Sequence, residues 1–137
     1  MNQYEGGCLC GSCRYIITAK KPDAMYLCHC SRCRKESGAA HGANVFFNDA
    51  QLTWKKGQDN IAYFKLENTR KERAFCKTCG SPLPRLSGTS QVILPAGTLD
   101  NDIALDPTAH IFYKSRSSWE DHLKDLKRFD ELPTEDR

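Results

Sequence analysis

Residues 8–13 read Cys8-Leu9-Cys10-Gly11-Ser12-Cys13, and residues 28–33 read Cys28-His29-Cys30-Ser31-Arg32-Cys33. Both stretches have the form C-x-C-x-x-C, and a third cluster, Cys76-Lys77-Thr78-Cys79-Gly80, has the form C-x-x-C-G. Alternate side chains of an extended chain point the same way, so C-x-C can present two sulfurs to one ion. A glycine after C-x-x-C permits the positive φ that a tight turn often requires. These spacings predict metal ligands, and cysteine ligands at such spacing are typical of zinc.

The eight cysteines could form two sites, because a structural zinc site is usually closed by four protein ligands. One division uses Cys8 and Cys10 with Cys76 and Cys79, which would tie distant parts of the chain together. It leaves Cys28, Cys30 and Cys33, with Cys13 or a histidine as a fourth ligand that would close the second site. With three protein ligands alone, that zinc would keep an open position, where zinc performs chemistry. Spacing alone leaves both alternatives open.

The composition agrees with metal ligation rather than disulfides. The chain has 137 residues, which suits one domain over residues 1–137, but only 39% are hydrophobic. No signal segment or membrane span is visible, so we expect a cytoplasmic protein whose thiols stay reduced. The net charge of +3 balances 20 basic against 17 acidic residues. That balance argues against a nucleic-acid partner.

Short apolar or alternating runs separated by turn residues predict a mostly β domain. A short helix is expected over residues 31–37, with Gly38 as its stop. A second helix is expected near the C-terminus, where Ser118 and Asp121 resemble a capping box and residues 119–126 carry one apolar packing face. The expected strands cover residues 14–19, 25–28, 43–47, 61–66, 73–76, 91–94 and 110–114.

The three cysteine clusters, taken with their neighbours, resemble the glutathione-dependent formaldehyde-activating enzyme family. This family is also called S-(hydroxymethyl)glutathione synthase and includes relatives of centromere protein V. The resemblance rests on Gly7-Cys8-x-Cys10-Gly11-x-x-x-Tyr15, on Cys28-His29-Cys30-x-x-Cys33-Arg34-Lys35-x-x-Gly38, and on Phe75-Cys76-x-x-Cys79-Gly80-Ser81-x-Leu83. It extends to His110-Ile111-Phe112, Ser115 and Trp119.

The resemblance implies a mostly β, Mss4-like (β-tent) single domain stabilised by zinc, with two zinc sites. By analogy, Cys8, Cys10, Cys76 and Cys79 match the structural ligands. Cys28, Cys30 and Cys33 match the ligands of a catalytic zinc. The family usually has a small apolar residue at the position of Cys13, which we therefore expect to be a buried, inert cysteine.

The resemblance also implies an activity, a carbon–sulfur lyase that adds formaldehyde to the thiol of glutathione or releases it. Zinc would activate the thiol, because three thiolates leave the ion a weak Lewis acid for the aldehyde. Arg32, Arg34 and Lys35 are candidates to hold the carboxylates of a glutathione-like thiol. His29 is expected to point away from the metal. His41 is a weaker candidate for a ligand or an acid–base group.

The sequence departs from the family pattern at one place near the C-terminus, and an alternative function is also open. Ser117-Ser118-Trp119-Glu120 stands where the family often has Ala-Pro-Trp and an aromatic residue. If this segment lines the substrate site, the substrate differs from glutathione. The alternative function is a non-catalytic zinc-stabilised Mss4-like binding module, because the fold alone does not decide function. A metal-storage or redox-sensing protein would require labile zinc at both sites.

Overall fold

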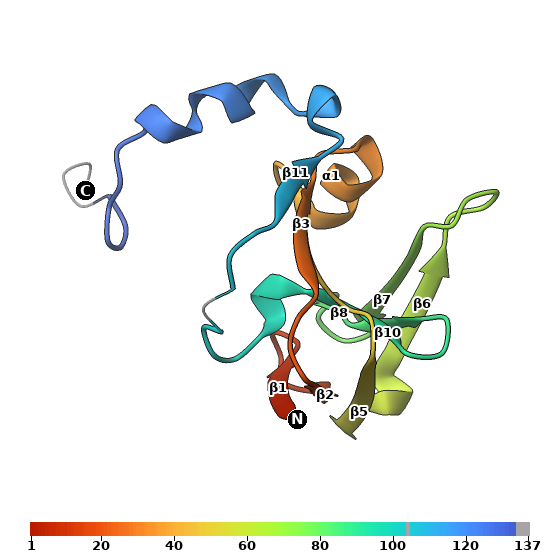
Figure 1. The fold of residues 1–137 in the computed structure, drawn as a ribbon. Coiled ribbons are helices and arrows are strands. Elements are labelled where there is room, and N and C mark those ends of the chain that lie inside the picture. Colours follow the sequence, from red (N-terminus) through yellow and green to blue (C-terminus); the bar gives the residue numbers. More distant parts are fainter. Residues whose placement is uncertain (104, 134–137) are drawn as a thin grey trace.

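The computed structural model describes residues 1–103 and 105–133, which form a mostly β protein built from three sheets (Figure 1). Residue 104 and the last four residues of the predicted domain 1–137 lie outside the described residues. The first sheet has the order β1-β2-β5, with antiparallel neighbours. Its strands are β1 Asn2–Gly7, β2 Arg14–Ala19 and β5 Ala50–Lys56. The Cys8–Cys13 stretch is therefore the turn between β1 and β2.

The second sheet has five strands in the order β11-β3-β4-β10-β9, and β11 runs parallel to β3. The strands are β3 Ala24–Cys28, β4 Gly42–Phe47, β9 Arg85–Ser87, β10 Gln91–Pro95 and β11 Ala109–Ile111. Helix α1, Ser31–Ser37, lies between β3 and β4 and ends at Gly38, whose φ of 66° gives the expected left-handed stop. This arrangement places the Cys28–Cys33 stretch where β3 passes into α1.

The third sheet has the order β6-β7-β8 and carries the third cysteine cluster. Its strands are β6 Ile61–Lys65, β7 Glu72–Cys76 and β8 Pro82–Leu83. The short 3₁₀ helices η1 Gln58–Asn60 and η2 Ala96–Thr98 lie before β6 and after β10. Cys76 ends β7, so the C-x-x-C-G turn joins β7 to β8 and returns the chain antiparallel.

Two buried clusters hold the sheets together. In β2, alternate residues Tyr15, Ile17 and Ala19 are buried, and they pack against side chains of β4 and β10. The remaining members of this cluster are Val45, Phe47, Val92 and Leu94. A second cluster contains three of the cysteines among apolar side chains: Cys8, Cys13, Ile61, Ala74, Cys76 and Leu83. The four-cysteine group thus lies beside a core of its own, where the first and third sheets meet.

The C-terminal segment differs from the prediction. The expected strand over residues 110–114 is only β11, followed by the 3₁₀ helix η3 Tyr113–Ser115. The second helix is a 3₁₀ helix, η4 Ser118–Asp125, whose N-cap is Ser117 and makes no side-chain capping bond. Figure 1 shows η4 (blue) extending away from the sheets. Trp119, Leu123 and Leu126 are exposed, so the expected packing face is not buried in a core.

Candidate metal centre

The sulfurs of Cys8, Cys10, Cys76 and Cys79 lie within 4.8 Å of one another. The Sγ–Sγ distance is 3.7 Å between Cys8 and Cys10 and 3.8 Å between Cys10 and Cys76. Four sulfurs placed ~2.3 Å from a tetrahedral zinc stand about 3.8 Å apart. Both measured distances therefore equal the edge of a zinc–sulfur tetrahedron, and four cysteines are a donor set that zinc prefers.

Hydrogen bonds favour thiolates at Cys76 and Cys79 of this four-cysteine group, whereas burial raises the pKa of Cys8. The backbone N–H of Cys13 donates to Cys8 Sγ at 3.2 Å, and that of Thr78 donates to Cys76 Sγ at 3.4 Å. Hydrogen bonds with Ser81 lower the pKa of Cys79 to about 5. Such outer partners orient ligands and stabilise their charged form. The turns after β1 and β7 thus supply both the ligands and their hydrogen-bond donors.

Cys13 lies outside the four-cysteine group. It is fully buried, and its sulfur lies 3.4 Å from the Gly57 carbonyl oxygen. Burial raises the pKa of the Cys13 thiol to about 12, so the thiol stays protonated at neutral pH. A buried thiol that donates to a backbone carbonyl has the properties of a packed core side chain.

The sulfurs of Cys28, Cys30 and Cys33 form a second group within 4.8 Å of one another. Cys28 ends β3, Cys30 is the N-cap of α1, and Cys33 lies in its first turn. Cys30 Sγ accepts the backbone N–H of Cys33 at 3.4 Å. Burial opposes ionisation of Cys30, but this bond and those with the neighbouring cysteines together lower its pKa. Within the described chain, no fourth histidine, cysteine or carboxylate joins this group.

Lys71 supplies a positive charge beside the second group. Its Nζ lies 3.6 Å from Cys33 Sγ and also forms an ion pair with Glu36 of α1. Burial acts to lower the pKa of Lys71, but Glu36 and Cys33 outweigh it, and the net shift is upward. Burial also raises the pKa of Cys33 to about 12, so this sulfur is a thiolate near pH 7 only with a bound cation.

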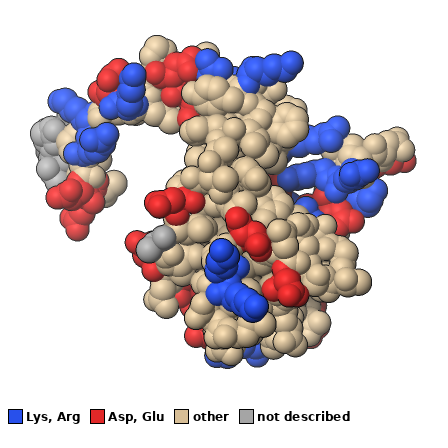
Figure 2. All heavy atoms as spheres, viewed as in Figure 1, with Lys and Arg blue, Asp and Glu red and all other residues tan. Residues whose placement is uncertain are grey.

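A hollow of about 280 Å³ opens beside the second group, between α1 and the β6–β7 hairpin. Figure 2 shows Lys and Arg side chains gathered on this side of the molecule. Its lining includes Arg32 and Lys35, two of the predicted substrate contacts, and also Lys71 and Arg73. The third predicted contact, Arg34, is engaged elsewhere, because its Nε donates to the His29 carbonyl at 3.2 Å. Glu36 and Glu72 also line the hollow, and its surface is mostly apolar, formed by Phe64, Leu66 and the stems of the charged side chains. The hollow therefore suits a ligand with an apolar body and an anionic group at the rim.

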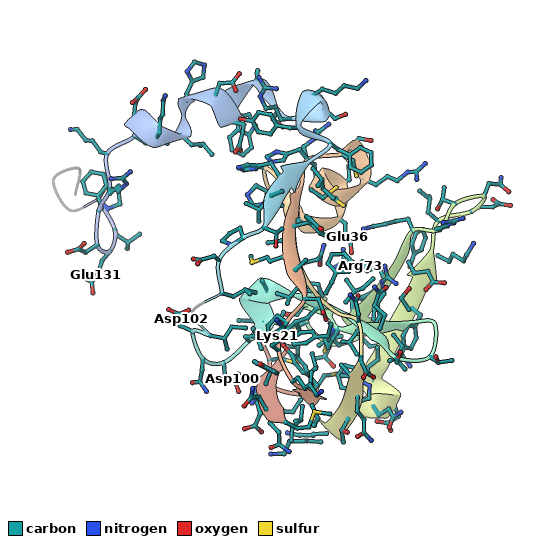
Figure 3. The ribbon with its side chains drawn as sticks, viewed as in Figure 1. Lys21, Glu36, Arg73, Asp100, Asp102 and Glu131 are labelled. Carbon is teal, nitrogen blue, oxygen red and sulfur yellow. The ribbon has the colours of Figure 1, made fainter. Side chains whose placement is uncertain are left out.

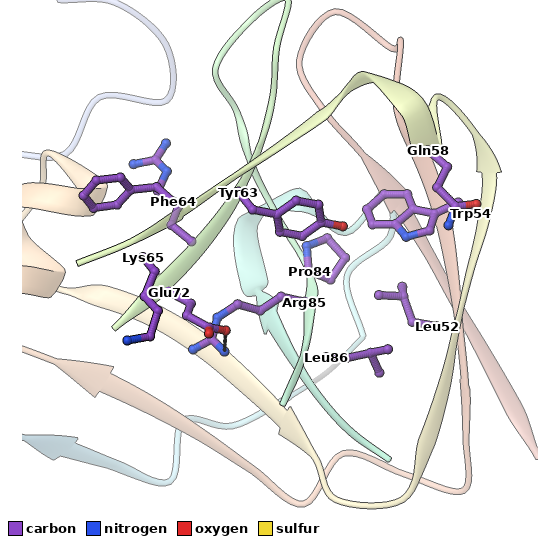
Figure 4. A pocket seen from close by; sticks show the side chains of 11 residues that line it. Leu52, Trp54, Gln58, Tyr63, Phe64, Lys65, Glu72, Pro84, Arg85 and Leu86 are labelled. Atoms are coloured by element: carbon purple, nitrogen blue, oxygen red, sulfur yellow. Dashed lines mark ion pairs between the residues drawn. The ribbon is translucent and has the colours of Figure 1, made fainter. Parts of the chain in front are cut away.

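A larger groove of about 420 Å³ lies on the other face of the β6–β7 hairpin (Figure 4). Tyr63, Lys65 and Glu72 line this groove, and they alternate along the paired strands with Phe64 and Arg73, which line the hollow. Figure 4 shows Tyr63, Pro84 and Trp54 along the groove and the ion pair between Glu72 and Arg85. The groove is apolar at its Trp54 end and charged at the other, and the hairpin separates it from the second cysteine group.

The sequence did not reveal Lys71 or Arg73. Both lie in or next to β7, and Lys71 reaches a sulfur 38 residues away in the chain. Arg73 donates to the carbonyl of Glu36 at 2.8 Å and to that of Gly80 at 3.1 Å, and Figure 3 shows it beneath α1. No local pattern marks a lysine or arginine that acts through a distant segment of the chain. Only the tertiary arrangement identifies these two residues.

The histidines lie apart from the sulfurs of the second group. His29 is fully buried, and its Nε2 lies 2.8 Å from His110 Nδ1. His41 packs against His29 with ring centroids 5.1 Å apart, and its Nδ1 donates to the Gly42 carbonyl at 3.1 Å. Neither His29 nor His41 joins the three-sulfur group.

Comparisons with known proteins place the chain in a family. The family model described as glutathione-dependent formaldehyde-activating enzyme matches residues 3–115. A Schizosaccharomyces pombe protein named as an uncharacterized lyase is 30% identical over 83 residues, which cover 61% of this chain and 57% of that protein. The chain thus matches little more than half of that relative's length.

A solved structure has a similar fold. A crystal structure of a Rhodobacter sphaeroides protein superposes with a TM-score of 0.60 at 20% identity. The superposition covers 77% of this chain and 98% of that one. At this identity the likeness concerns the fold alone.

Proposed function

Because the chain belongs to the glutathione-dependent formaldehyde-activating enzyme family, we propose that it is a zinc-dependent carbon–sulfur lyase. Its reaction joins an aldehyde such as formaldehyde to a glutathione-like thiol, or releases the aldehyde from the adduct. The observation that carries this proposal is the three-sulfur group of Cys28, Cys30 and Cys33 beside a hollow whose rim carries Arg32 and Lys35. We further propose an Mss4-like single domain over residues 1–137 that works in the cytoplasm.

The two cysteine groups have different roles in this proposal. Cys8, Cys10, Cys76 and Cys79 would hold a closed, structural zinc. Cys28, Cys30 and Cys33 would hold a second zinc with an open position, where zinc lowers the pKa of an incoming thiol. That makes two Zn²⁺ ions per chain.

The chain's own residues would bind and orient the thiol. Arg32 and Lys35, at the rim of the hollow, would pair with the carboxylates of an anionic thiol. Lys71 would offset part of the negative charge that three thiolates bring to the site. In the forward direction the thiolate sulfur bonds to the aldehyde carbon, and the oxygen that gains the electron pair takes up a proton. In reverse, the carbon–sulfur bond breaks and the thiolate leaves.

The test is zinc stoichiometry combined with thiol binding, measured on the wild type, Cys30→Ala and Cys30→Ser. Serine keeps an N-cap acceptor for the Cys33 N–H but removes the sulfur, so it separates loss of metal from loss of the helix. We expect two zinc ions in the wild type. Both variants should remain folded, with one zinc and no detectable glutathione binding.

Two outcomes would contradict the proposal. A single zinc that survives the Cys30 substitutions would mean that the Cys28–Cys33 stretch holds no stable metal. Two zinc ions without thiol binding or aldehyde addition would favour the non-catalytic binding module.

A further inference from the structure

A third group of potential ligands lies apart from both cysteine groups. It consists of His29, His110 and Glu120, which each offer one ligand atom within 4.8 Å of the others. His29 follows β3, His110 lies in β11 and Glu120 lies in η4. The group thus joins the second sheet to the C-terminal segment.

Two buried polar atoms in this group have no hydrogen-bond partner among the described residues. They are Nδ1 of His29, whose side chain is fully buried, and Oε2 of Glu120. A buried polar atom without a partner costs about 1–3 kcal/mol. His29 Nε2 already faces His110 Nδ1, so one nitrogen of the buried ring remains unpaired in either tautomer. A cation held between His29 Nε2 and His110 Nδ1 would give the Glu120 oxygen its missing partner, whereas Nδ1, the second nitrogen of the His29 ring, would stay unpaired.

The donor set suits a divalent transition-metal ion. Two histidines and one glutamate are an established set for zinc with an open fourth position. The His29–His110 nitrogens, 2.8 Å apart, now share one proton. At Zn–N distances of ~2.0–2.1 Å, two coordinating nitrogens stand about 3.3 Å apart, so the pair would have to open by about 0.5 Å. His110 is exposed and lies on an edge strand, so it can make this shift.

The surroundings favour a cation over an anion. The Glu120 carboxylate lies within 4.8 Å of the ligand atoms of both imidazoles. Tyr113 lies edge-on to His29, with ring centroids 5.1 Å apart, and contacts His110 at the same distance. The nearest cation is Arg116, which is held by Asp121 through a 2.8 Å hydrogen bond and lies over the Tyr113 ring.

We propose that His29, His110 and Glu120 form a third metal site that fastens the C-terminal segment to the second sheet. It takes a divalent transition-metal ion and, having no thiolate, binds it more weakly than the cysteine groups, so that ion is lost when excess metal is removed. This site is independent of the lyase proposal. It accounts for the position of η4, whose apolar residues are exposed and supply no packing of their own. Metal ligation would replace the missing hydrophobic contact, as it does in small domains with little core.

Cobalt binding tests the proposal. The protein is first loaded with two equivalents of zinc, which the thiolates of the two cysteine groups take up in preference to nitrogen and oxygen ligands, and Co²⁺ is then titrated while absorption is recorded. Co²⁺ at a cysteine group gives a sulfur-to-metal charge-transfer band, whereas Co²⁺ at a nitrogen and oxygen site gives only ligand-field bands. We expect one equivalent of the second kind. His110→Ala and Glu120→Gln should weaken it at least tenfold.

His122→Ala is the matched control, because His122 is an exposed histidine of η4 outside the group. It should bind Co²⁺ like the wild type. Hydrogen exchange gives a second readout, since metal should slow exchange of the Glu120 and Leu126 amides in the wild type and His122→Ala only. Absence of sulfur-free Co²⁺ binding in the wild type would overturn the proposal, as would unchanged binding in both His110→Ala and Glu120→Gln. Neither result depends on whether the lyase activity exists.

Discussion

Lys71 is the residue that sets the charge at the three-cysteine group. Its Nζ contacts Cys33 Sγ at 3.6 Å, and Glu36 holds it in place. Lys71→Met keeps much of the aliphatic stem but removes the charge, so an anionic thiol should bind about tenfold more weakly. The zinc content should stay the same, because lysine is not a ligand. Calorimetric titration with glutathione measures this effect.

Lys55→Met is the control for this prediction, since Lys55 pairs with Glu5 on the first sheet. Its glutathione affinity should match that of the wild type. Unchanged affinity in Lys71→Met would show that Lys71 contributes only to the structure of α1.

Tyr15 is a buried residue whose ionisation should couple to stability. Its hydroxyl lies 2.7 Å from Thr98 Oγ1, and burial raises its pKa from 10.0 to about 12. Stability from the neutral phenol is complete below the unfolded pKa of 10. It is lost as pH rises toward the folded pKa, because the unfolded chain releases the proton first.

Tyr15→Phe should therefore cost about 1 kcal/mol at pH 7, where it removes one hydrogen bond. Between pH 9 and pH 11, the wild type should lose about 1.4 kcal/mol more than the variant. Urea unfolding of both proteins at these pH values measures the difference. Parallel pH profiles would mean that Tyr15 ionises equally in the folded and unfolded states.

At the scale of elements, two glycines with positive φ differ in how closely the neighbouring chain approaches them. Gly57 has a φ of 77°, and a Cβ there would lie 2.1 Å from the Ser12 carbonyl oxygen. Gly88 has a φ of 72° but open space around it. Gly88→Ala should cost only the left-handed strain, about 1–2 kcal/mol.

Gly57→Ala should cost that strain and also force the β1–β2 turn away from β5, with a total loss above about 3 kcal/mol. Thermal and urea unfolding of the two variants measure this ordering. Equal losses would show that the turn can move freely away from Gly57.

The sequence predicts most elements where pattern and burial coincide. The strand over residues 14–19 and the helix over residues 31–37 occur with the expected bounds, because alternation and a glycine stop are local signals. The strands β1 and β5 were missed. The residues of β1 are mostly exposed and alternate little, whereas β5 alternates Ala50, Leu52 and Trp54 with polar residues, a local signal that could have identified it. The C-terminal prediction of a packed helix was wrong, because periodicity does not say whether a partner surface exists.

The residues of the candidate site likewise fall into those that local sequence patterns predict and those that only tertiary contacts reveal. Cysteine spacing identifies both sulfur groups, because C-x-C and C-x-x-C bring ligands together by local geometry. The pairing of residues 8–10 with residues 76–79 needed the family resemblance, since spacing left Cys13 as a competing ligand. Lys71, Arg73 and the His29 group depend on contacts between distant segments, which no local pattern encodes.

At the scale of the whole molecule, the two cysteine groups lie at junctions between elements. The four-cysteine group joins the first sheet to the third, and the three-cysteine group joins β3 to α1. Arg73 links the two, since it donates to Glu36 of α1 and to Gly80 of the C-x-x-C-G turn. Among the helices that the structure describes, none is long and apolar enough to cross a membrane. Hydrogen bonds from one residue of β7 thus link the segments that carry the two cysteine groups.

The four-cysteine group should dominate the stability of the fold, because its second core cluster is small and includes three cysteines. Cys79→Ser removes one ligand at a half-buried position and should cost one zinc ion and more than about 10 °C in Tm. Cys13→Ser changes a fully buried cysteine outside the group. It should keep both zinc ions and lower Tm by only a few degrees, at a cost of about 1 kcal/mol.

Elemental analysis and thermal unfolding of the two variants distinguish the roles of these cysteines. The serine hydroxyl at position 13 could donate to the Gly57 carbonyl, as the thiol does now, so a large loss there would not come from a missing hydrogen bond. Loss of zinc from Cys13→Ser would make Cys13 a ligand and reopen the division of the eight cysteines. Retention of both zinc ions by Cys79→Ser would show that three sulfurs suffice at this junction, and the distinction between a closed and an open site would then fail.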